Sequence, residues 1–478
     1  MPSPPAAAVA ILAMLGFGVL LGSATSQIAQ SAGARSILLE VASPAPAPEA
    51  PAPQTSVAAP APEAPAPFPA TAPSFPAIPP ATEAPVPEQP APILPPEIPE
   101  AETLPPVKHV FMIVLGENGY EETFGEGSPA PYLATTLPEK GELLANYYAV
   151  TEGRLANEIA LLSGQGPTPE TATDCSSYTD LLPGTLSAEG QVEGAGCVYP
   201  ATTPILPGQL IEKKLKWKAY IEDMADGCSH EEAQLNPFVY FHALVDDGEC
   251  ATSAAGLDRL MLDLKTATKT AALSYIVPNA CHGGGVQPCE DGQPTGPLAA
   301  EDFLEEVVPA IEASPAFEEG GLIAITSAQA PQSGPEADPS SCCISPEYPN
   351  LPAPQALEDV TGPVKPTGGG GRVGLLLISP FVAPGSRNES GYYNHYSLLR
   401  SVEELFELEP LGYAADLALA PFDSSVYNAE SAAPVAPAGS SSRASCRDCA
   451  SSTPSADHSS PSSSKKPWRA RLDLKTTR

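Results

Sequence analysis

Two polar residues, Glu117 and Asn118, directly follow an apolar run in the first third of the chain. The run, residues 107–116, is rich in β-branched and large apolar side chains and ends at a glycine, which predicts a buried strand. In open α/β sheets, ligands bind beyond the carboxyl ends of the strands. A carboxylate and an amide at that place are able to hold a metal ion or a phosphate. The alternative is an ordinary strand end followed by turn residues.

The elements around this pair alternate in type. Further strand-like runs occupy 218–222, 273–277, 322–326 and 373–379. Helical periodicity occurs near 131–140, 155–163, 206–215, 256–269, 298–313 and 395–407. This alternation predicts an α/β fold with a mostly parallel central sheet and helices on both faces.

Composition divides the chain into four parts. Residues 43–106 contain 23 prolines in 64 positions, so we expect 27–106 to be a disordered, extended linker. Residues 107–428 are long enough for one substantial domain, and 429–478 form a Ser- and Pro-rich tail that we also expect to be disordered.

The first 26 residues suggest export. An apolar run from Ala6 to Gly22 precedes small residues, as in a signal peptide, although no Lys or Arg precedes the run. The run is also long enough to stay as a membrane anchor. Either reading predicts an exported protein, extracellular or anchored at the cell envelope.

Cysteine usage agrees with export. Eight of the ten cysteines lie in 107–428, which suggests disulfides, and the shortest pairings are Cys175 with Cys197 and Cys228 with Cys250. A zinc site is less favoured, because this region has no CxxC motif.

Charge limits the class of partner. A net charge of −34 argues against a protein that binds nucleic acid. The end of the tail, residues 465–478, is basic, so it could touch anionic polymers or lipids of the cell envelope, or serve only as a solubilising end.

Several blocks of the domain, in this order, resemble one family. They are 109–118, 130–133, 144–151, 160–165, 217–224, 236–241 and 393–406. Together they resemble bacterial phosphoesterases of the acid phosphatase and phospholipase C type, in the alkaline phosphatase superfamily. The resemblance implies that superfamily's fold and a metal-dependent hydrolysis of phosphoric esters. In such chemistry a hydroxyl attacks phosphorus while two divalent ions, zinc, manganese or magnesium, stabilise the attacking and leaving oxygens.

The resemblance assigns metal ligands to four residues. Glu117 and Asn118 match the first ligand pair, and His395 matches a late metal-binding histidine. Relatives have an Asp-x-His motif shortly after a Pro-Asn pair. This chain has Pro278-Asn279 followed by a single histidine, His282, which lies slightly out of register with that motif.

The nucleophile position departs from the family's pattern. Relatives read Thr-His-Pro-Ser-x-Pro-Asn where this chain has residues 151–157, so Arg154 occupies the position of the hydroxyl. Arginine cannot attack phosphorus, but it can bind phosphate through two hydrogen bonds. Asn157 matches the asparagine that helps to hold phosphate, and Thr151 is the fallback nucleophile.

A second departure removes metal ligands. Ala328 and Gln329 stand where relatives have an Asp-Glu pair, which predicts one ion rather than two unless Glu290, Asp291 or Asp338 substitutes.

Three functions therefore remain open. The first is a metal-dependent hydrolase of phosphoric esters. The second is a non-catalytic protein on the same scaffold that binds a phosphate ester or an anionic glycan. The third is an envelope-tethered interaction protein with a vestigial site.

Overall fold

The computed structural model describes residues 103–429, apart from 225–227, 229–235, 286–288, 290–292, 345 and 353–361. The expected export segment, the Pro-rich linker and the basic tail lie outside the described residues. Among the described residues, no helix combines the length and the apolarity needed to cross a membrane.

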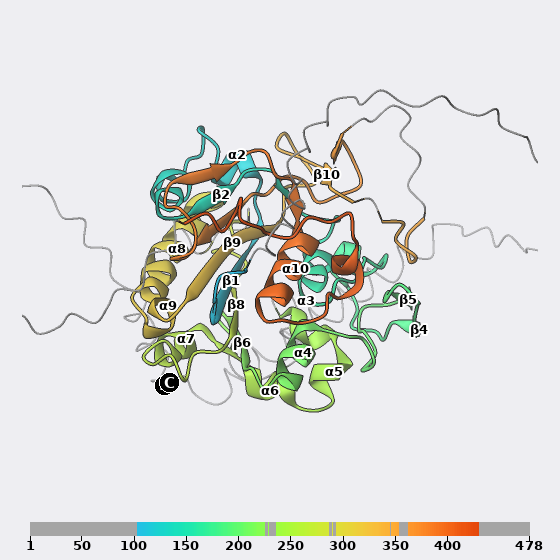
Figure 1. Ribbon diagram of the computed structural model, residues 1–478. Helices are drawn as coiled ribbons and strands as arrows, with labels where there is room; N and C mark the ends of the chain where they lie inside the picture. Colours follow the sequence, from blue (N-terminus) through green and yellow to red (C-terminus); the bar gives the residue numbers. More distant parts are fainter. Residues whose placement is uncertain are drawn as a thin grey trace, which may run out of the picture. The chain divides into compact units, whose positions relative to one another are not determined.

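An eight-stranded sheet forms the centre of this region (Figure 1). Its strands, in spatial order, are β13 (Ser386–Asn388), β2 (Glu142–Leu144), β12 (Leu375–Ile378), β9 (Gly321–Gln329), β1 (His109–Glu117), β8 (Leu273–Val277), β6 (Trp217–Ile221) and β7 (Ala254–Gly256). Every neighbouring pair is parallel except the two that involve β12, which runs against both β9 and β2. The predicted mostly parallel sheet is confirmed, and so are all five predicted strands.

Three two-stranded ribbons lie outside this sheet. They are β3 (Tyr147–Tyr148) with β14 (Tyr393–Asn394), β4 (Leu182–Leu186) with β5 (Val192–Ala195), and β10 (Ser341–Cys342) with β11 (Val364–Lys365).

Helices cover both faces of the sheet. The longer ones are α3 (Arg154–Ser163), α4 (Leu206–Glu212), α7 (Leu257–Asp263), α8 (Pro297–Glu312) and α10 (His395–Leu405). Four short α-helices of about one turn are α2 (Tyr120–Thr123), α5 (His242–Val245), α6 (Glu249–Ser253) and α9 (Pro315–Glu318). The 3₁₀ turns are η2 (Pro138–Lys140), η3 (Thr171–Thr173), η5 (Pro237–Tyr240) and η6 (Gly412–Ala415). One π-helical turn is η1 (Tyr132–Thr136). The predicted helix at 131–140 was wrong in type: Pro138 has no N–H to continue a helix, and two short turns form instead.

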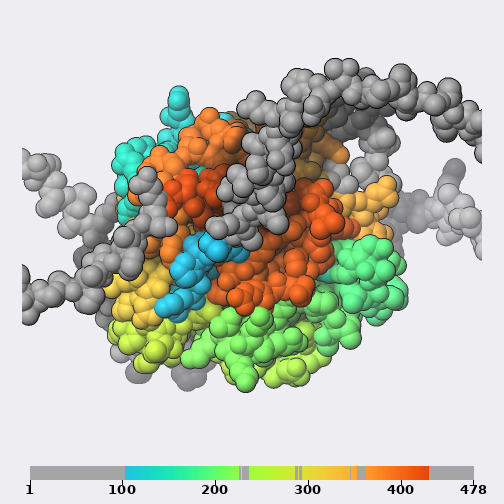
Figure 2. Space-filling view, viewed as in Figure 1, coloured from blue at the N-terminus to red at the C-terminus, as the bar shows by residue number. Residues whose placement is uncertain are grey.

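The two cores follow from the alternation of side chains along β1. Val110, Met112 and Val114 pack into the core beneath α3, α4, α5 and α10, while Phe111, Ile113 and Leu115 pack beneath α2, α7, α8 and α9. Figure 2 shows the face on which the residues around α10, in orange-red, meet the green segment near residues 200–260. Because β1 is buried on both faces, its residues 110–115 form a continuous apolar run, as is typical of parallel strands.

Four disulfides join the eight cysteines of this region. Cys175–Cys197 and Cys228–Cys250 confirm the two predicted pairings, and Cys281–Cys289 and Cys342–Cys343 complete the set.

Candidate functional site

The carboxyl edge of the parallel strands brings several of the expected residues together. β1 ends at Glu117, and its neighbour β9 ends at the paired residue Gln329. The backbone N–H of Asn118 donates to the carbonyl of Gln329 at 2.9 Å, and its side-chain amide donates to the carbonyl of Gly283 at 2.6 Å. The ends of β1 and β9 and the loop after β8 therefore meet around one asparagine.

Asn118 is enclosed by this contact. Its side-chain oxygen is buried without a hydrogen-bond partner, and a Cβ on Gly284 would lie 2.0 Å from it. Gly284, whose φ is +86°, is therefore required for the loop to close over the amide. Glu117 differs, because its exposed carboxylate accepts the backbone N–H of Gln332 at 3.1 Å.

Arg154 begins α3 and binds within the protein. Its guanidinium donates to the carboxylate of Glu158, one turn further along the helix, at 2.9 Å. Burial raises the pKa of Glu158 to about 7, although the charge of Arg154 acts in the opposite direction. The position of the expected nucleophile is thus occupied by one half of a largely buried ion pair.

Asn157 holds the loop that precedes α3. Its oxygen accepts the backbone N–H groups of Val150 and Thr151 at 2.9 and 3.3 Å, and its amide donates to the carbonyls of Thr151 and Gly153 at 2.7 and 2.9 Å. Because both the oxygen and the nitrogen of this amide are hydrogen-bonded to backbone groups, the side chain of Asn157 positions the loop rather than a phosphate. Gln329 supports the same loop, since its side-chain oxygen accepts the N–H of Gly153 at 2.8 Å.

His395 is fully buried, and both of its ring nitrogens are hydrogen-bonded. Nε2 lies 2.8 Å from the carbonyl of Ala328 and must donate to it, so Nδ1 accepts from the hydroxyl of Tyr147 at 2.8 Å. Burial lowers the pKa of His395 to about 4, so the ring is neutral near pH 7. In this arrangement neither nitrogen offers a lone pair to a metal ion.

His282 lies at the same edge, in the loop after β8. Its Nδ1 is 2.7 Å from the carboxylate of Glu222, a hydrogen bond that raises the pKa of the histidine. Within the described part of the chain, one group of His, Cys, Asp and Glu side chains has ligand atoms close enough for a metal ion: Cys281, His282 and Cys289, all within 4.8 Å. A disulfide joins the two cysteines, so their sulfurs are not thiolate ligands in this state.

The described residues therefore do not fit a two-metal centre. Asp338, one of the expected substitutes, accepts backbone N–H groups from Ser340 and Arg372 at 2.9 and 2.8 Å. Glu290 and Asp291, the other two, lie outside the described residues.

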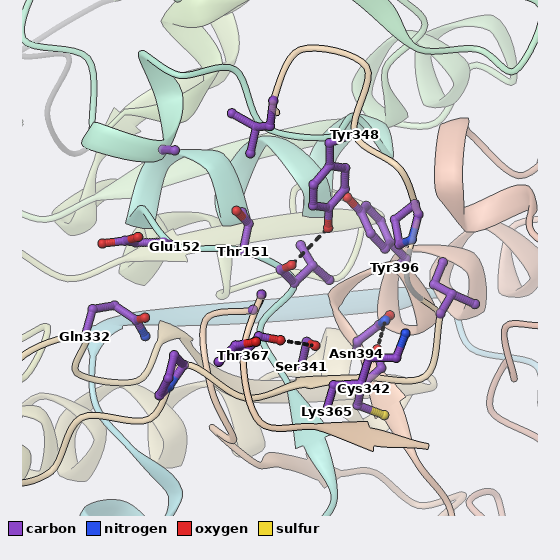
Figure 3. Close-up of a pocket in the computed structure, with 18 of the residues that line it drawn as sticks. Thr151, Glu152, Gln332, Ser341, Cys342, Tyr348, Lys365, Thr367, Asn394 and Tyr396 are labelled. Atoms are coloured by element: carbon purple, nitrogen blue, oxygen red, sulfur yellow. Dashed lines mark hydrogen bonds between the residues drawn. The ribbon is translucent and has the colours of Figure 1, made fainter. Parts of the chain in front are cut away.

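A pocket of about 460 Å³ opens beside this edge (Figure 3). Of the expected site residues, Thr151 lines it, and the hydroxyl of Thr151 has no hydrogen-bond partner among the described residues. Gln332 connects the pocket to the strand end, because it lines the pocket and binds Glu117. Arg154, Asn157, His282 and His395 are not among the described lining residues.

The rest of the wall comes from residues that the sequence did not single out. Polar lining side chains are those of Glu152, Ser341, Lys365, Thr367 and Asn394, and the aromatic ones are Tyr348 and Tyr396. Most of them belong to the segment between β9 and β12. The sequence offered one usable signal, the length of that segment, which carries many glycines and prolines and few apolar runs.

Comparison with known proteins identifies the family. The chain matches the Phosphoesterase family over residues 126–409, and it belongs to that family. No curated protein matches the chain.

Solved structures give distant likenesses. A protein of the alkaline phosphatase superfamily from Vibrio parahaemolyticus is 10% identical with a TM-score of 0.41, covering 64% of this chain and 68% of its own. The lipoteichoic acid synthase LtaP from Listeria monocytogenes is 10% identical with a TM-score of 0.38, covering 64% and 74%. The phosphonate monoester hydrolase SpPMH from Silicibacter pomeroyi is also 10% identical with a TM-score of 0.38, covering 68% and 78%.

Proposed function

We propose that this member of the phosphoesterase family binds a phosphate ester or an anionic glycan without hydrolysing it. One observation carries the proposal: the guanidinium of Arg154, which stands where the sequence resemblance places the nucleophile, pairs with Glu158. The engagement of both nitrogens of His395 and the replacement of two carboxylates by Ala328 and Gln329 support it. The assignment to the acid phosphatase or phospholipase C type remains part of the proposal and rests on the ordered sequence blocks.

The pocket supplies the binding chemistry. Lys365 is the cation and Glu152 the carboxylate among the described lining residues, and Figure 3 shows them apart, with Glu152 at the left and Lys365 near Cys342 and Asn394. An anionic group at the Lys365 end would avoid the repulsion of Glu152. Thr151 and Thr367 offer hydroxyls, and the partly exposed Tyr348 offers apolar surface for a sugar ring or an ester chain.

Calorimetry tests the binding, with inorganic phosphate and glucose 6-phosphate as probes. We expect wild-type protein to bind at least one probe, and Lys365→Gln to weaken that binding about tenfold, as the loss of one charged hydrogen bond does. Lys213→Gln, on the exposed end of α4, is the matched control and should bind like the wild type. Absence of binding, or equal affinity in Lys365→Gln, would contradict the proposed pocket.

Hydrolysis through Thr151 is the second candidate, because this hydroxyl residue lines the pocket. A divalent ion bound by Glu117 and other oxygen ligands would be needed to stabilise the charge on the ester, and the described residues do not gather a set for it. Turnover of p-nitrophenyl phosphate with added zinc, manganese or magnesium, lost in Thr151→Val and in Glu117→Ala, would replace the binding function by this one. Metal analysis of the purified protein accompanies the assay, and we expect at most one bound ion per chain.

Export is the proposed setting of this function. The apolar run of residues 6–22 and the cysteine usage support it, and the basic tail would add contact with the cell envelope. Fractionation of cells that produce the chain with and without residues 429–478 tests both points. Recovery in the cytoplasm would refute export, and equal envelope association of the two chains would refute the role of the tail.

A further inference from the structure

Cys342 and Cys343 are adjacent in the chain and joined to each other by a disulfide. A bond between neighbouring cysteines closes a small ring that contains the peptide unit between them, so it fixes the backbone of both residues. Cys343 has a φ of +89°, outside the range that side chains other than glycine favour. The closed ring therefore restrains the turn at which Cys343 adopts this φ.

The turn connects two elements. The carbonyl of Cys342 accepts the side-chain amide of Asn394 at 3.0 Å, and Asn394 is the N-cap of α10. The backbone N–H of Cys343 donates to the carbonyl of Pro363 at 3.2 Å, next to β11. The disulfide therefore sits where the β10–β11 ribbon meets the start of α10.

The same ribbon forms one wall of the pocket. Ser341 pairs with Lys365 across the ribbon, and its hydroxyl donates to the carbonyl of Thr367 at 2.9 Å. Ser341, Cys342, Lys365 and Thr367 all line the pocket (Figure 3). The position of the cation in the pocket thus depends on a ribbon that the adjacent disulfide fixes at one end.

We propose that Cys342–Cys343 is a site of reversible redox modification that sets the geometry of this pocket wall. An effect of the disulfide on ligand affinity rests on the proposed binding function. An effect of the disulfide on the geometry of the pocket wall does not. The disulfide holds the wall in the form described, and the dithiol releases it.

The reaction requires a dithiol reductant. Cys343 is partly exposed while Cys342 is buried, so a thiolate of the reductant attacks the sulfur of Cys343, and Cys342 leaves as a thiolate and takes a proton. The second thiol of the reductant then displaces Cys343. The protein gains two electrons and two protons, and the reductant departs as its disulfide.

Hydrogen exchange of the full chain tests the control of the wall without any ligand. The variants are Cys342→Ser with Cys343→Ser and, as a matched control, Cys228→Ser with Cys250→Ser, which removes a disulfide that does not line the pocket. The backbone amides of Gly369 and Gly371 donate to the carbonyls of Pro339 and Ser340, next to the ribbon. We expect these amides to exchange at least tenfold faster in the first variant and at the wild-type rate in the control. Equal exchange of residues 341–371 in both variants would overturn the proposal.

Calorimetry with glucose 6-phosphate then tests the consequence for binding. We expect at least a tenfold loss of affinity in the Cys342→Ser, Cys343→Ser variant and none in the control. Equal affinity would overturn redox regulation of binding. If the oxidised wild type binds neither glucose 6-phosphate nor inorganic phosphate, the proposed function fails, and the exchange experiment alone decides whether the disulfide controls the wall.

Discussion

At the scale of single residues, several side chains that the sequence resemblance placed at a catalytic site serve the fold. Asn157 and Gln329 bind the backbone of the loop at 150–153, and His395 joins β9 to Tyr147. Sequence comparison alone assigned binding roles to Asn157 and His395, because it compares residue types and not their hydrogen bonds. The Arg154–Glu158 pair was within reach of the sequence, since its spacing of four residues is that of neighbours on one helix face.

Replacement of Asn157 by alanine should destabilise the protein by about 2–4 kcal/mol, because it removes the partners of several buried backbone groups at once. Urea unfolding would measure the loss. Asn146→Ala is the control, since the amide of Asn146 makes one exposed hydrogen bond, to Glu389, and should cost less than about 1 kcal/mol. Similar losses in the two variants would contradict the structural role of Asn157.

Acid should destabilise the protein through His395. The folded pKa is about 4 and the ordinary value is 6.5, so between these values the unfolded chain binds the proton and the folded chain does not. Stability from this group is present above pH 6.5 and falls by about 3 kcal/mol as the pH drops to 4.

Unfolding free energies of wild type and His395→Gln at pH 7 and pH 4 would isolate this contribution, since other titrating groups are common to both proteins. The wild type should lose about 3 kcal/mol more than the variant over that interval. If the unfolding free energies of the two proteins differed by the same amount at pH 7 and at pH 4, the pKa of His395 would not be lowered in the folded protein.

At the scale of elements, the sequence was informative where burial alone determines the structure. The central strands β1, β8 and β9 are buried and mostly apolar, so their apolar runs predicted them directly. The short strands β2, β10, β11 and β13 form through pairing with distant partners, which no local pattern records. Two of these strands, β10 and β11, form part of the pocket wall, and most of the other lining residues lie in loops that no local pattern predicts.

The glycine-rich end of that wall depends on close packing. A Cβ on Gly370 would lie 2.3 Å from the carbonyl oxygen of Thr151 and 2.8 Å from the Cβ of Ala149. Gly370→Ala should therefore cost about 1–3 kcal/mol and displace Thr151 at the pocket. Gly127→Ala, where a Cβ would meet nothing within 4 Å, is the control and should leave the unfolding midpoint unchanged or slightly raised. Unchanged stability of Gly370→Ala in urea would mean that the loop relaxes freely.

At the scale of the whole molecule, the domain should fold without its flanking segments. Its core includes Leu419, Phe422 and Val426, all at most 2% exposed, near the end of the described residues. A chain of residues 103–429 should unfold at the same urea concentration as the full chain. A chain that ends at residue 417 should lose at least about 4 kcal/mol, because it lacks these three buried side chains. Equal stability of the two shortened chains would refute the assignment of this boundary.

The direction of β12 has a consequence for how this protein can change. Because β12 runs against β9, the connection between them leaves and re-enters the sheet at the same edge, the one that carries Glu117 and Thr151. Parallel neighbours must be joined by a long crossover, usually a helix, whereas antiparallel neighbours can be joined by a loop of any length. The strand order therefore does not fix the length of the connection between β9 and β12. Insertions, deletions or grafted loops between residues 331 and 372 can therefore remodel the pocket wall, including the β10–β11 ribbon, while the pairing of the eight-stranded sheet stays intact. Variation concentrated in this segment would alter the pocket and leave the central sheet unchanged.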